Sequence, residues 1–190
     1  MPGPNTIELA AVGRSEEGLR SILVGGNAVN LHAYLRSTFD VDLLIPEEEA
    51  QNWRSFFERH GYAVFHATSN FVRLRFAADP TGALPVDLML ADSETFERIY
   101  KKGRAYPVGH NLELVIPDPL HLVAMKLHAL RNPRRIERGV DLEDVKHLVK
   151  AAKIDTTSPE FVALLDRYAT AEIRARLLRD LEEGDSVSPS

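Results

Sequence analysis

Two aspartates two positions apart, Asp40 and Asp42, are the residues whose types and spacing point most directly to chemistry. In a β-strand such residues share one face, so both carboxylates would lie opposite Val41, Leu43 and Ile45, which would face the core. At a separation of about 6–7 Å the two charges would repel by roughly 3 kcal/mol at an effective dielectric constant of about 20. A cation relieves this repulsion, and carboxylate oxygens suit Mg²⁺ or Mn²⁺. The pair therefore predicts a metal site, with a solvated edge strand as the alternative.

The residues before the aspartates predict how they are positioned. A short apolar run, 22–24, favours a buried strand that leads into Gly25 and Gly26, and a helix is expected over roughly 27–35 before a strand over 39–45. Glycines let the backbone approach a bound group closely, and a helix beginning near Asn27 offers backbone N–H groups and its positive dipole end to a phosphate. Gly25, Gly26 and Asn27 are therefore predicted phosphate-binding positions. The alternative is that the two glycines form only a turn.

This order of residues resembles a known signature. Gly25-Gly26, thirteen intervening residues and then Asp40-Val41-Asp42-Leu43 are similar to the glycine pair, helix and Asp-x-Asp strand of the polymerase-β-like nucleotidyltransferase superfamily. That family carries a third carboxylate on a later strand, and Asp87, between Val86 and Leu88, matches it. The resemblance implies a nucleotidyltransferase fold, an NTP co-substrate and Mg²⁺ (or Mn²⁺) held by the three aspartates, with Asp87 also acting as general base.

A second block lies in the C-terminal part. Lys126 stands among apolar residues, so its ammonium is expected either to meet an anionic group or to reach solvent. With the Asp141-Leu-Glu-Asp144 segment, this lysine resembles the AbiEii-type nucleotidyltransferases, the toxin halves of type IV toxin–antitoxin pairs. The resemblance covers about residues 21–150 and implies that Lys126 contacts the nucleotide's phosphates, that Asp141 completes the catalytic site and that Asp144 is structural. Val140 departs from the family, which often has a basic residue there.

Several basic and polar side chains could add phosphate contacts. Arg36 and Thr38 directly precede the acidic strand and are further candidates for binding the nucleotide. Arg73 and Arg75 share one face of an expected strand over 71–77. They could neutralise a triphosphate or pair with the acidic strand, although a solvated face is slightly favoured.

The resemblance also implies an acceptor and a partner. It indicates RNA, with tRNA 3′ ends as the leading acceptor, and a cognate antitoxin or regulator. A concentrated basic stretch, expected on an interhelical loop, could meet RNA phosphates; it consists of Arg131, Arg134, Arg135 and Arg138. A small hydroxylated acceptor, as in the aminoglycoside-modifying branch, is the main alternative, and the acidic net charge favours cationic substrates. A non-catalytic nucleotide-binding module and a Mg²⁺-dependent nuclease are further alternatives.

Composition bounds the remaining possibilities. The chain has 23 Lys and Arg against 28 Asp and Glu, a net charge of −5, which argues against a dominant nucleic-acid-binding surface. Without cysteine it forms neither disulfides nor thiolate metal sites. No apolar run approaches the roughly 20 residues that span a bilayer, and the N-terminal residues lack the order of a signal peptide. No membrane association and a cytoplasmic location are therefore expected.

The pattern along the chain predicts an α+β protein with a mixed β-sheet flanked by helices and followed by a C-terminal helical part. Residues 1–116 would form the nucleotidyltransferase core, 117–183 a helical subdomain with one long helix from Ser158 to about Glu183, and 184–190 a disordered tail. The aromatics Trp53, Phe56 and Phe57 are expected in the core.

Overall fold

The computed structural model describes residues 5–78, 83–109 and 111–185, and these divide into two compact units. The first unit holds the chain up to Ala28 and then Arg36–Asp118; the second holds Val29–Leu35 and the chain from Pro119 onward. Helix α2 (Gly25–His32) therefore begins in one unit and ends in the other. The turn expected at 79–82 lies outside the described residues.

The first unit is built on a mixed seven-stranded sheet of order β3-β4-β5-β2-β1-β7-β6. The pairs β2·β5 and β1·β7 are parallel, and the other neighbouring pairs are antiparallel. Its strands are β1 (Ile22–Leu23), β2 (Val41–Pro46), β3 (Tyr62–Thr68), β4 (Phe71–Phe76), β5 (Val86–Ala91), β6 (Arg104–Gly109) and β7 (Leu112–Ile116). Because β2 and β5 are adjacent and parallel, side chains at matching positions of the two strands lie next to one another.

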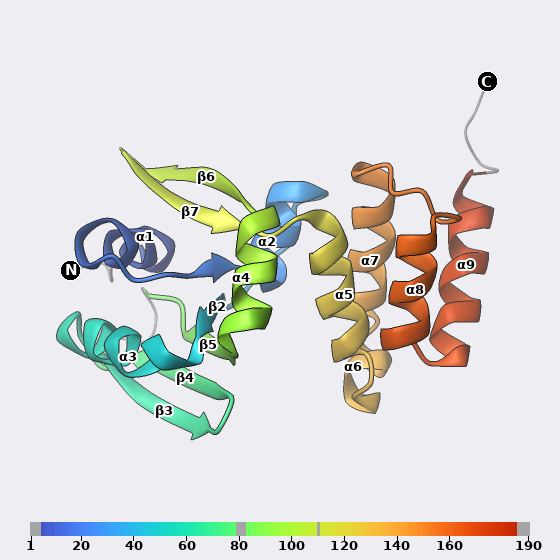
Figure 1. Cartoon of the computed structure of the whole chain (residues 1–190). Coiled ribbons are helices and arrows are strands. Elements are labelled where there is room, and N and C mark those ends of the chain that lie inside the picture. Colours follow the sequence, from blue (N-terminus) through green and yellow to red (C-terminus); the bar gives the residue numbers. More distant parts are fainter. Residues whose placement is uncertain (1–4, 79–82, 110, 186–190) are drawn as a thin grey trace. The chain divides into compact units, whose positions relative to one another are not determined.

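Helices pack on this sheet. Figure 1 shows α1 beside β6 and β7, and α3 beside β3. The helical segments of this unit, apart from α2, are α1 (Thr6–Glu17), the 3-10 turn η1 (Glu47–Glu49), α3 (Ala50–Arg59) and α4 (Ser93–Lys102). Trp53, Phe56 and Phe57 of α3 are buried against one another, so their predicted place in the core is confirmed.

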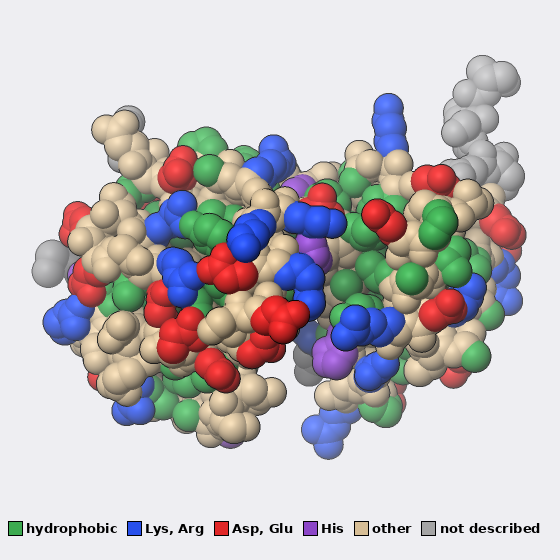
Figure 2. Space-filling view, viewed as in Figure 1, with side chains coloured by type: hydrophobic (Ala, Val, Ile, Leu, Met, Phe, Trp, Pro, Cys, Tyr) green, Lys and Arg blue, Asp and Glu red, His purple; other side chains and the backbone are tan. Residues whose placement is uncertain are grey.

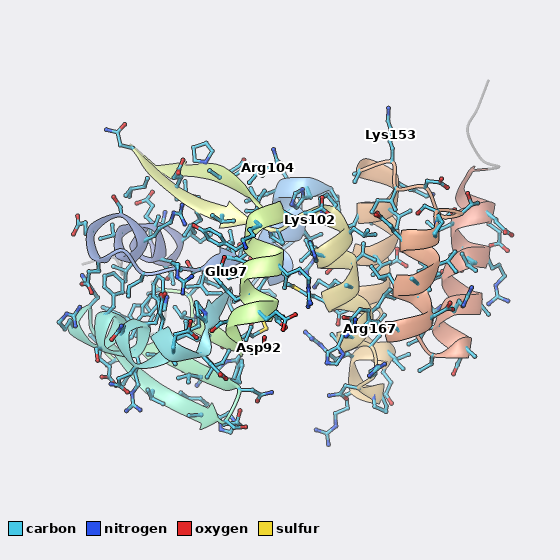
Figure 3. All side chains as sticks on the ribbon, viewed as in Figure 1. Asp92, Glu97, Lys102, Arg104, Lys153 and Arg167 are labelled. Atoms are coloured by element: carbon cyan, nitrogen blue, oxygen red, sulfur yellow. The ribbon has the colours of Figure 1, made fainter. Side chains whose placement is uncertain are left out.

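Charged side chains fix α4 and its surroundings. Asp92 caps the helix by accepting a hydrogen bond from the Thr95 backbone N–H, and Lys102 lies at the opposite end of α4, as Figure 3 shows. Both charges complement the helix dipole. Arg20 forms ion pairs with three glutamates of η1 and α4, Glu48, Glu49 and Glu97. Acidic and basic side chains accordingly lie side by side over α4 in the space-filling view (Figure 2).

The second unit is helical. Figure 1 shows α5, α7, α8 and α9 side by side. Its helices are α5 (Pro119–Ala129), α6 (Pro133–Arg138), α7 (Val140–Ala151), α8 (Pro159–Tyr168) and α9 (Ala171–Asp185). The expected α+β class, with a mixed sheet followed by C-terminal helices, is confirmed. Among the described residues, no helix is long and apolar enough to cross a membrane.

Three details of the helical part differ from expectation. The basic stretch is not a loop: α6 runs through it, because Asn132 caps the Arg134 N–H and Pro133 suits the first helical turn. The single helix expected from Ser158 is two, since Thr170 accepts the Ile173 N–H and starts α9 afresh. Positions 184 and 185 of the expected tail continue α9, and 186–190 lie outside the described residues.

Candidate active site

Three carboxylates meet where β2 and β5 lie together. In the register of these parallel strands Asp42 stands opposite Asp87, and Asp40 directly precedes β2. Asp40, Asp42 and Asp87 each place one oxygen so that the three oxygens lie within 4.8 Å of one another. Asp40 and Asp42 are half-buried, whereas Asp87 is only 4% exposed. The predicted carboxylate pair, Asp40 and Asp42, is thus part of a cluster of three carboxylates whose oxygens could share one cation.

Arg73 of β4 reaches into this cluster. It stands opposite Asp87 in the antiparallel pairing of β4 and β5. Its Nε donates to Asp87 Oδ1 at 2.6 Å, and its Nη2 donates to Asp87 Oδ2 at 2.5 Å and to Asp40 Oδ2 at 3.3 Å. The hydrogen bond to Asp87, with the charges of Asp87, Asp40 and Asp42, raises the pKa of Arg73 above its ordinary value against the opposing effect of burial. Of the alternatives for Arg73, pairing with the acidic strand is the one that the structure shows.

Gly25 brings the start of α2 directly against Asp42. Its φ of 63° lies in the left-handed region, and a Cβ at this position would overlap the Asp42 carboxylate. The neighbouring Val24 N–H donates to the Asp42 carbonyl at 2.9 Å, which ties the end of β1 to β2. Only glycine therefore allows both this backbone conformation and this close approach. The helix begins at Gly25, two residues earlier than the sequence indicated.

Gly26 makes room for Arg36 and Thr38, two of the predicted nucleotide-binding residues. A Cβ here would lie 2.5 Å from Thr38 Cγ2 and 2.9 Å from Arg36 Nη2. The Asn27 side chain donates to the Asp40 carbonyl at 2.8 Å, and the Thr38 hydroxyl donates to Asn27 Oδ1 at 3.1 Å. These bonds hold the segment before β2 over the first turn of α2, with the Arg36 guanidinium beside it. A helix N-terminus with an adjacent guanidinium can bind an anion such as a phosphate.

The residues at this place fit a hard divalent ion. Three carboxylates supply oxygen donors of the kind that Mg²⁺ and Mn²⁺ prefer. Mg²⁺ proteins commonly use one or two carboxylates and complete the shell with water and substrate phosphates. The α2 N-terminus, which suits phosphate, lies directly beside Asp42. The arrangement can thus hold an ion and a phosphate group next to one another.

The other two predicted catalytic residues, Lys126 and Asp141, meet in the second unit. Lys126 of α5 is 6% exposed and places its Nζ 3.0 Å from Asp141 Oδ1 and 2.8 Å from Asp144 Oδ2, both on α7. Arg135 Nε lies 3.1 Å from Asp141 Oδ2, and the Tyr34 hydroxyl donates to Asp144 Oδ1 at 2.8 Å. The anionic group that Lys126 was expected to meet is therefore a pair of aspartates. Its contact with a nucleotide, and the catalytic role of Asp141, stay predictions.

Other arginines are engaged locally. Arg75, on the same face of β4 as Arg73, lies over the Phe65 ring with its guanidinium carbon 3.6 Å from the ring centroid. Arg131 donates to the Arg167 carbonyl at 2.6 Å. Arg135 forms an ion pair with Asp141 of α7. The basic stretch around α6 thus uses at least two of its arginines to join helices of the second unit.

The sequence contained a signal for the role of Arg73. Its register opposite Asp87 is the one that a hairpin centred near position 80 produces, and the Asp79-Pro-Thr-Gly82 segment is a strong turn signal there. Alternation along one strand indicated only that Arg73 and Arg75 share a face. Counting both strands outward from this four-residue segment places Arg73 opposite Leu88, one residue from Asp87, so the count indicates the neighbourhood of the third carboxylate but not the register.

No family model matches the chain, and no curated protein matches its sequence. Solved structures do match it, among them ANT(2'')-Ia in complex with adenylyl-2''-tobramycin, at a TM-score of 0.63 and 16% identity over 86% of this chain and 96% of that one. An antigenic nucleotidyltransferase-like protein from Paracoccidioides brasiliensis matches at a TM-score of 0.56 and 16% identity over 96% of this chain and 95% of that one.

A solution structure of ANT(2'')-Ia gives a TM-score of 0.55 and 14% identity over 97% of this chain and the whole of that one. These identities are low, so the matches concern the fold. The chain therefore has the nucleotidyltransferase fold, as its glycine pair and aspartates predicted.

Proposed function

We propose that this protein is a metal-dependent nucleotidyltransferase that transfers NMP from an NTP to a hydroxyl acceptor. The observation that carries the proposal is the meeting of Asp40, Asp42 and Asp87 within 4.8 Å, with the glycine N-terminus of α2 against Asp42, in a nucleotidyltransferase fold. Carboxylates for a divalent ion and a helix N-terminus for phosphate are what transfer from a triphosphate requires. A fold kept only for binding has no comparable need for three converging carboxylates.

Each group has a role in this reaction. Asp40, Asp42 and Asp87 hold the divalent ion, which, when bound, neutralises charge on the phosphates and acts as a Lewis acid. The backbone at Gly25, Gly26 and Asn27, with Arg36 beside it, binds the leaving phosphates. The acceptor oxygen forms a bond to the α-phosphorus while the bond to the β-phosphate bridging oxygen breaks, and pyrophosphate leaves. The proton of the acceptor hydroxyl passes to Asp87.

For the acceptor we favour a small hydroxylated, cationic molecule. The match to ANT(2'')-Ia, which was solved with an adenylylated aminoglycoside, covers 96% of that chain. The net charge of −5 also suits a cationic substrate better than a polyanion. RNA, such as a tRNA 3′ end, with a cognate antitoxin as partner, is the second candidate and rests on the sequence resemblance of the Lys126 block. The engagement of Arg131 and Arg135 within the second unit weakens it.

Transfer can be tested directly. The full chain would be incubated with each α-³²P-labelled NTP and Mg²⁺, in the presence of aminoglycosides, a small-molecule extract or total RNA. Asp42→Asn removes one carboxylate of the cluster at nearly constant size, and Glu94→Gln removes an exposed one from α4 as the matched control. We expect label in the small-molecule fraction with the wild type and Glu94→Gln, and none with Asp42→Asn.

The fraction that carries the label distinguishes between the candidate acceptors. Label in RNA would establish the second acceptor class instead of the first. Transfer that survives Asp42→Asn in a folded protein would contradict the proposed site. Absence of label in every fraction with every NTP would favour a non-catalytic nucleotide-binding module.

A further inference from the structure

The guanidinium of Arg73 occupies the point between two of the proposed metal ligands. Its Nη2 lies 2.5 Å from Asp87 Oδ2 and 3.3 Å from Asp40 Oδ2, so one cationic nitrogen bridges carboxylates that come from two strands. Its Nε holds the other oxygen of Asp87 at 2.6 Å. One positive group thus compensates two of the carboxylates that would hold an ion at the proposed site.

We propose that Arg73 is an internal counter-cation that holds the carboxylate cluster in the metal-free protein and has to withdraw when a divalent ion binds. Arg73 is then a positioning residue that sets the metal concentration at which the site loads. The inference rests on the proposed function, because it takes the three aspartates as the metal site. It goes beyond that function by assigning a competitor for the metal within the chain.

Withdrawal follows from charge and distance. Mg²⁺ binds oxygen at about 2.0–2.1 Å, so an ion held by Asp40 and Asp87 would lie close to the positive Nη2, which contacts both carboxylates. Arginine does not lose its proton in proteins, so the repulsion is relieved only if the side chain moves. Arg73 has a route, because its side chain is 33% exposed and its stem is long.

The same contacts explain why an arginine is present. Asp87 is almost fully buried, and an ionised carboxylate in that position needs a charged or hydrogen-bonding partner. Arg73 supplies two hydrogen bonds to it. It therefore stabilises the metal-free state and opposes metal binding, and these two effects have opposite consequences when Arg73 is removed.

Mn²⁺ binding to the purified full-length protein measures how strongly Arg73 opposes metal binding. The dissociation constant can be read from the electron paramagnetic resonance signal of free Mn²⁺, for wild type, Arg73→Gln and Arg75→Gln. Arg75→Gln is the matched control, because it removes the same charge from the same face of β4, where the guanidinium lies over the Phe65 ring. Neither nucleotide nor activity enters the measurement.

We expect Arg73→Gln to bind Mn²⁺ at least about tenfold more tightly than wild type, because a like charge beside the ion is gone. Arg75→Gln, whose charge is solvent-exposed and screened, should change the constant by less than about threefold. Unchanged or weaker Mn²⁺ binding by Arg73→Gln would overturn the proposal and make Arg73 an orienting partner of Asp87. An equal gain in both variants would also overturn it, since it would reflect net charge alone.

Thermal stability measures how much Arg73 stabilises the protein when no metal is bound. In EDTA we expect Arg73→Gln to melt below wild type, and in saturating Mg²⁺ we expect the difference to shrink or reverse. An ion pair with only a structural role would leave the same difference under both conditions, and that result would overturn the proposal. If Arg73→Gln does not fold, Arg73→Lys keeps the charge but loses the paired donors to Asp87. Its flexible ammonium should be displaced more readily than the bidentate guanidinium, so it should bind Mn²⁺ more tightly than wild type, although by less than expected for Arg73→Gln.

The two proposals fail differently. If wild type binds Mn²⁺ and Asp42→Asn does not, the metal site stands whatever Arg73→Gln does. If wild type, Arg73→Gln and Arg73→Lys all leave Mn²⁺ free, the cluster is not a metal site and both proposals fall. Binding by Arg73→Gln but not by wild type would support the counter-cation role most strongly.

Discussion

The two units each contain a cluster of aspartates around a cation, and the clusters differ in how they are built. In the second unit, the four oxygens of Asp141 and Asp144 are contacted by Lys126, Arg135 and Tyr34, and the lysine and both aspartates are almost fully buried. In the first unit, three carboxylates converge on a common point that one guanidinium partly fills, and two of them are half-buried.

From this difference we expect the first cluster to take a ligand and the second to contribute to the stability of the fold. Matched charges buried together have their partners within the protein, and breaking such a pair leaves an uncompensated charge. Converging carboxylates with a route to solvent keep oxygens available to an ion from outside. The first cluster therefore suits metal binding, and the second suits the joining of α5, α7 and the Val29–Leu35 segment.

Loss of Lys126 should give the largest effect on stability. Lys126→Met keeps the length of the stem but leaves Asp141 and Asp144 without their shared ammonium, so the free energy of unfolding should fall by about 3–5 kcal/mol. Urea denaturation followed by circular dichroism measures this change.

A matched lysine and a compensated variant sharpen the result. Lys150→Met, at an exposed position of α7, should change the free energy of unfolding by less than about 0.5 kcal/mol. Adding Asp141→Asn and Asp144→Asn to Lys126→Met should recover part of the loss. A loss below about 1 kcal/mol for Lys126→Met alone would contradict the structural role and would favour the predicted contact of Lys126 with nucleotide phosphates.

Substitution of Gly25 tests whether the backbone at the start of α2 shapes the first cluster. Gly25→Ala should cost about 1–2 kcal/mol for its positive φ and about 1–3 kcal/mol more for the overlap with Asp42, and it should abolish Mn²⁺ binding by displacing that carboxylate. Gly18 has a similar φ of 68°, and a Cβ there would meet nothing within 4 Å. Gly18→Ala is therefore the control: it should show the first cost only, with normal Mn²⁺ binding. Equal effects of the two substitutions on metal binding would show that the Gly25 contact does not shape the site.

The sequence predicted what depends on short-range pattern. The Asp40–Asp42 spacing, the glycine pair and the apolar neighbours of Asp87 are local features, and the structure brings these carboxylates together. The aromatic core of α3 was predicted for the same reason, since its spacing is helical. Local chemistry and local geometry coincide at these positions, so the residue pattern was sufficient.

Contacts between distant elements were not predictable in the same way. The partner of Arg73 depends on the register of β4 and β5, and the partner of Lys126 depends on how α5 packs on α7. The break between α8 and α9 depends on the side-chain cap from Thr170, which interrupts an otherwise continuous apolar pattern. The grouping of Val29–Leu35 with the helices follows from contacts such as Tyr34 with Asp144 and His147, which no periodicity indicates.

Tyr34 tests one edge of the buried cluster. Tyr34→Phe removes the hydroxyl that donates to Asp144 but keeps the ring that stacks on His147. A hydrogen bond to a charged group contributes about 1.5–3 kcal/mol, so a loss of that size in the free energy of unfolding is expected. Tyr168→Phe is the control in the same unit, because its ring contacts His128 and its hydroxyl makes no hydrogen bond among the described residues. Equal small changes in both variants would show that Asp144 does not depend on Tyr34.

Arg135 should have the smallest effect, although it contacts the same aspartate as Lys126. Its side chain is 51% exposed, so its ion pair with Asp141 is screened by solvent, and Arg135→Gln should lower the free energy of unfolding by less than about 1 kcal/mol. Raising the NaCl concentration from 20 mM to 1 M should remove most of this difference, while the loss in Lys126→Met should persist because its partners are buried. Urea denaturation of both variants at the two salt concentrations measures this. A loss for Arg135→Gln as large and as salt-insensitive as that for Lys126→Met would mean that burial of the ammonium does not explain the strength of the second cluster.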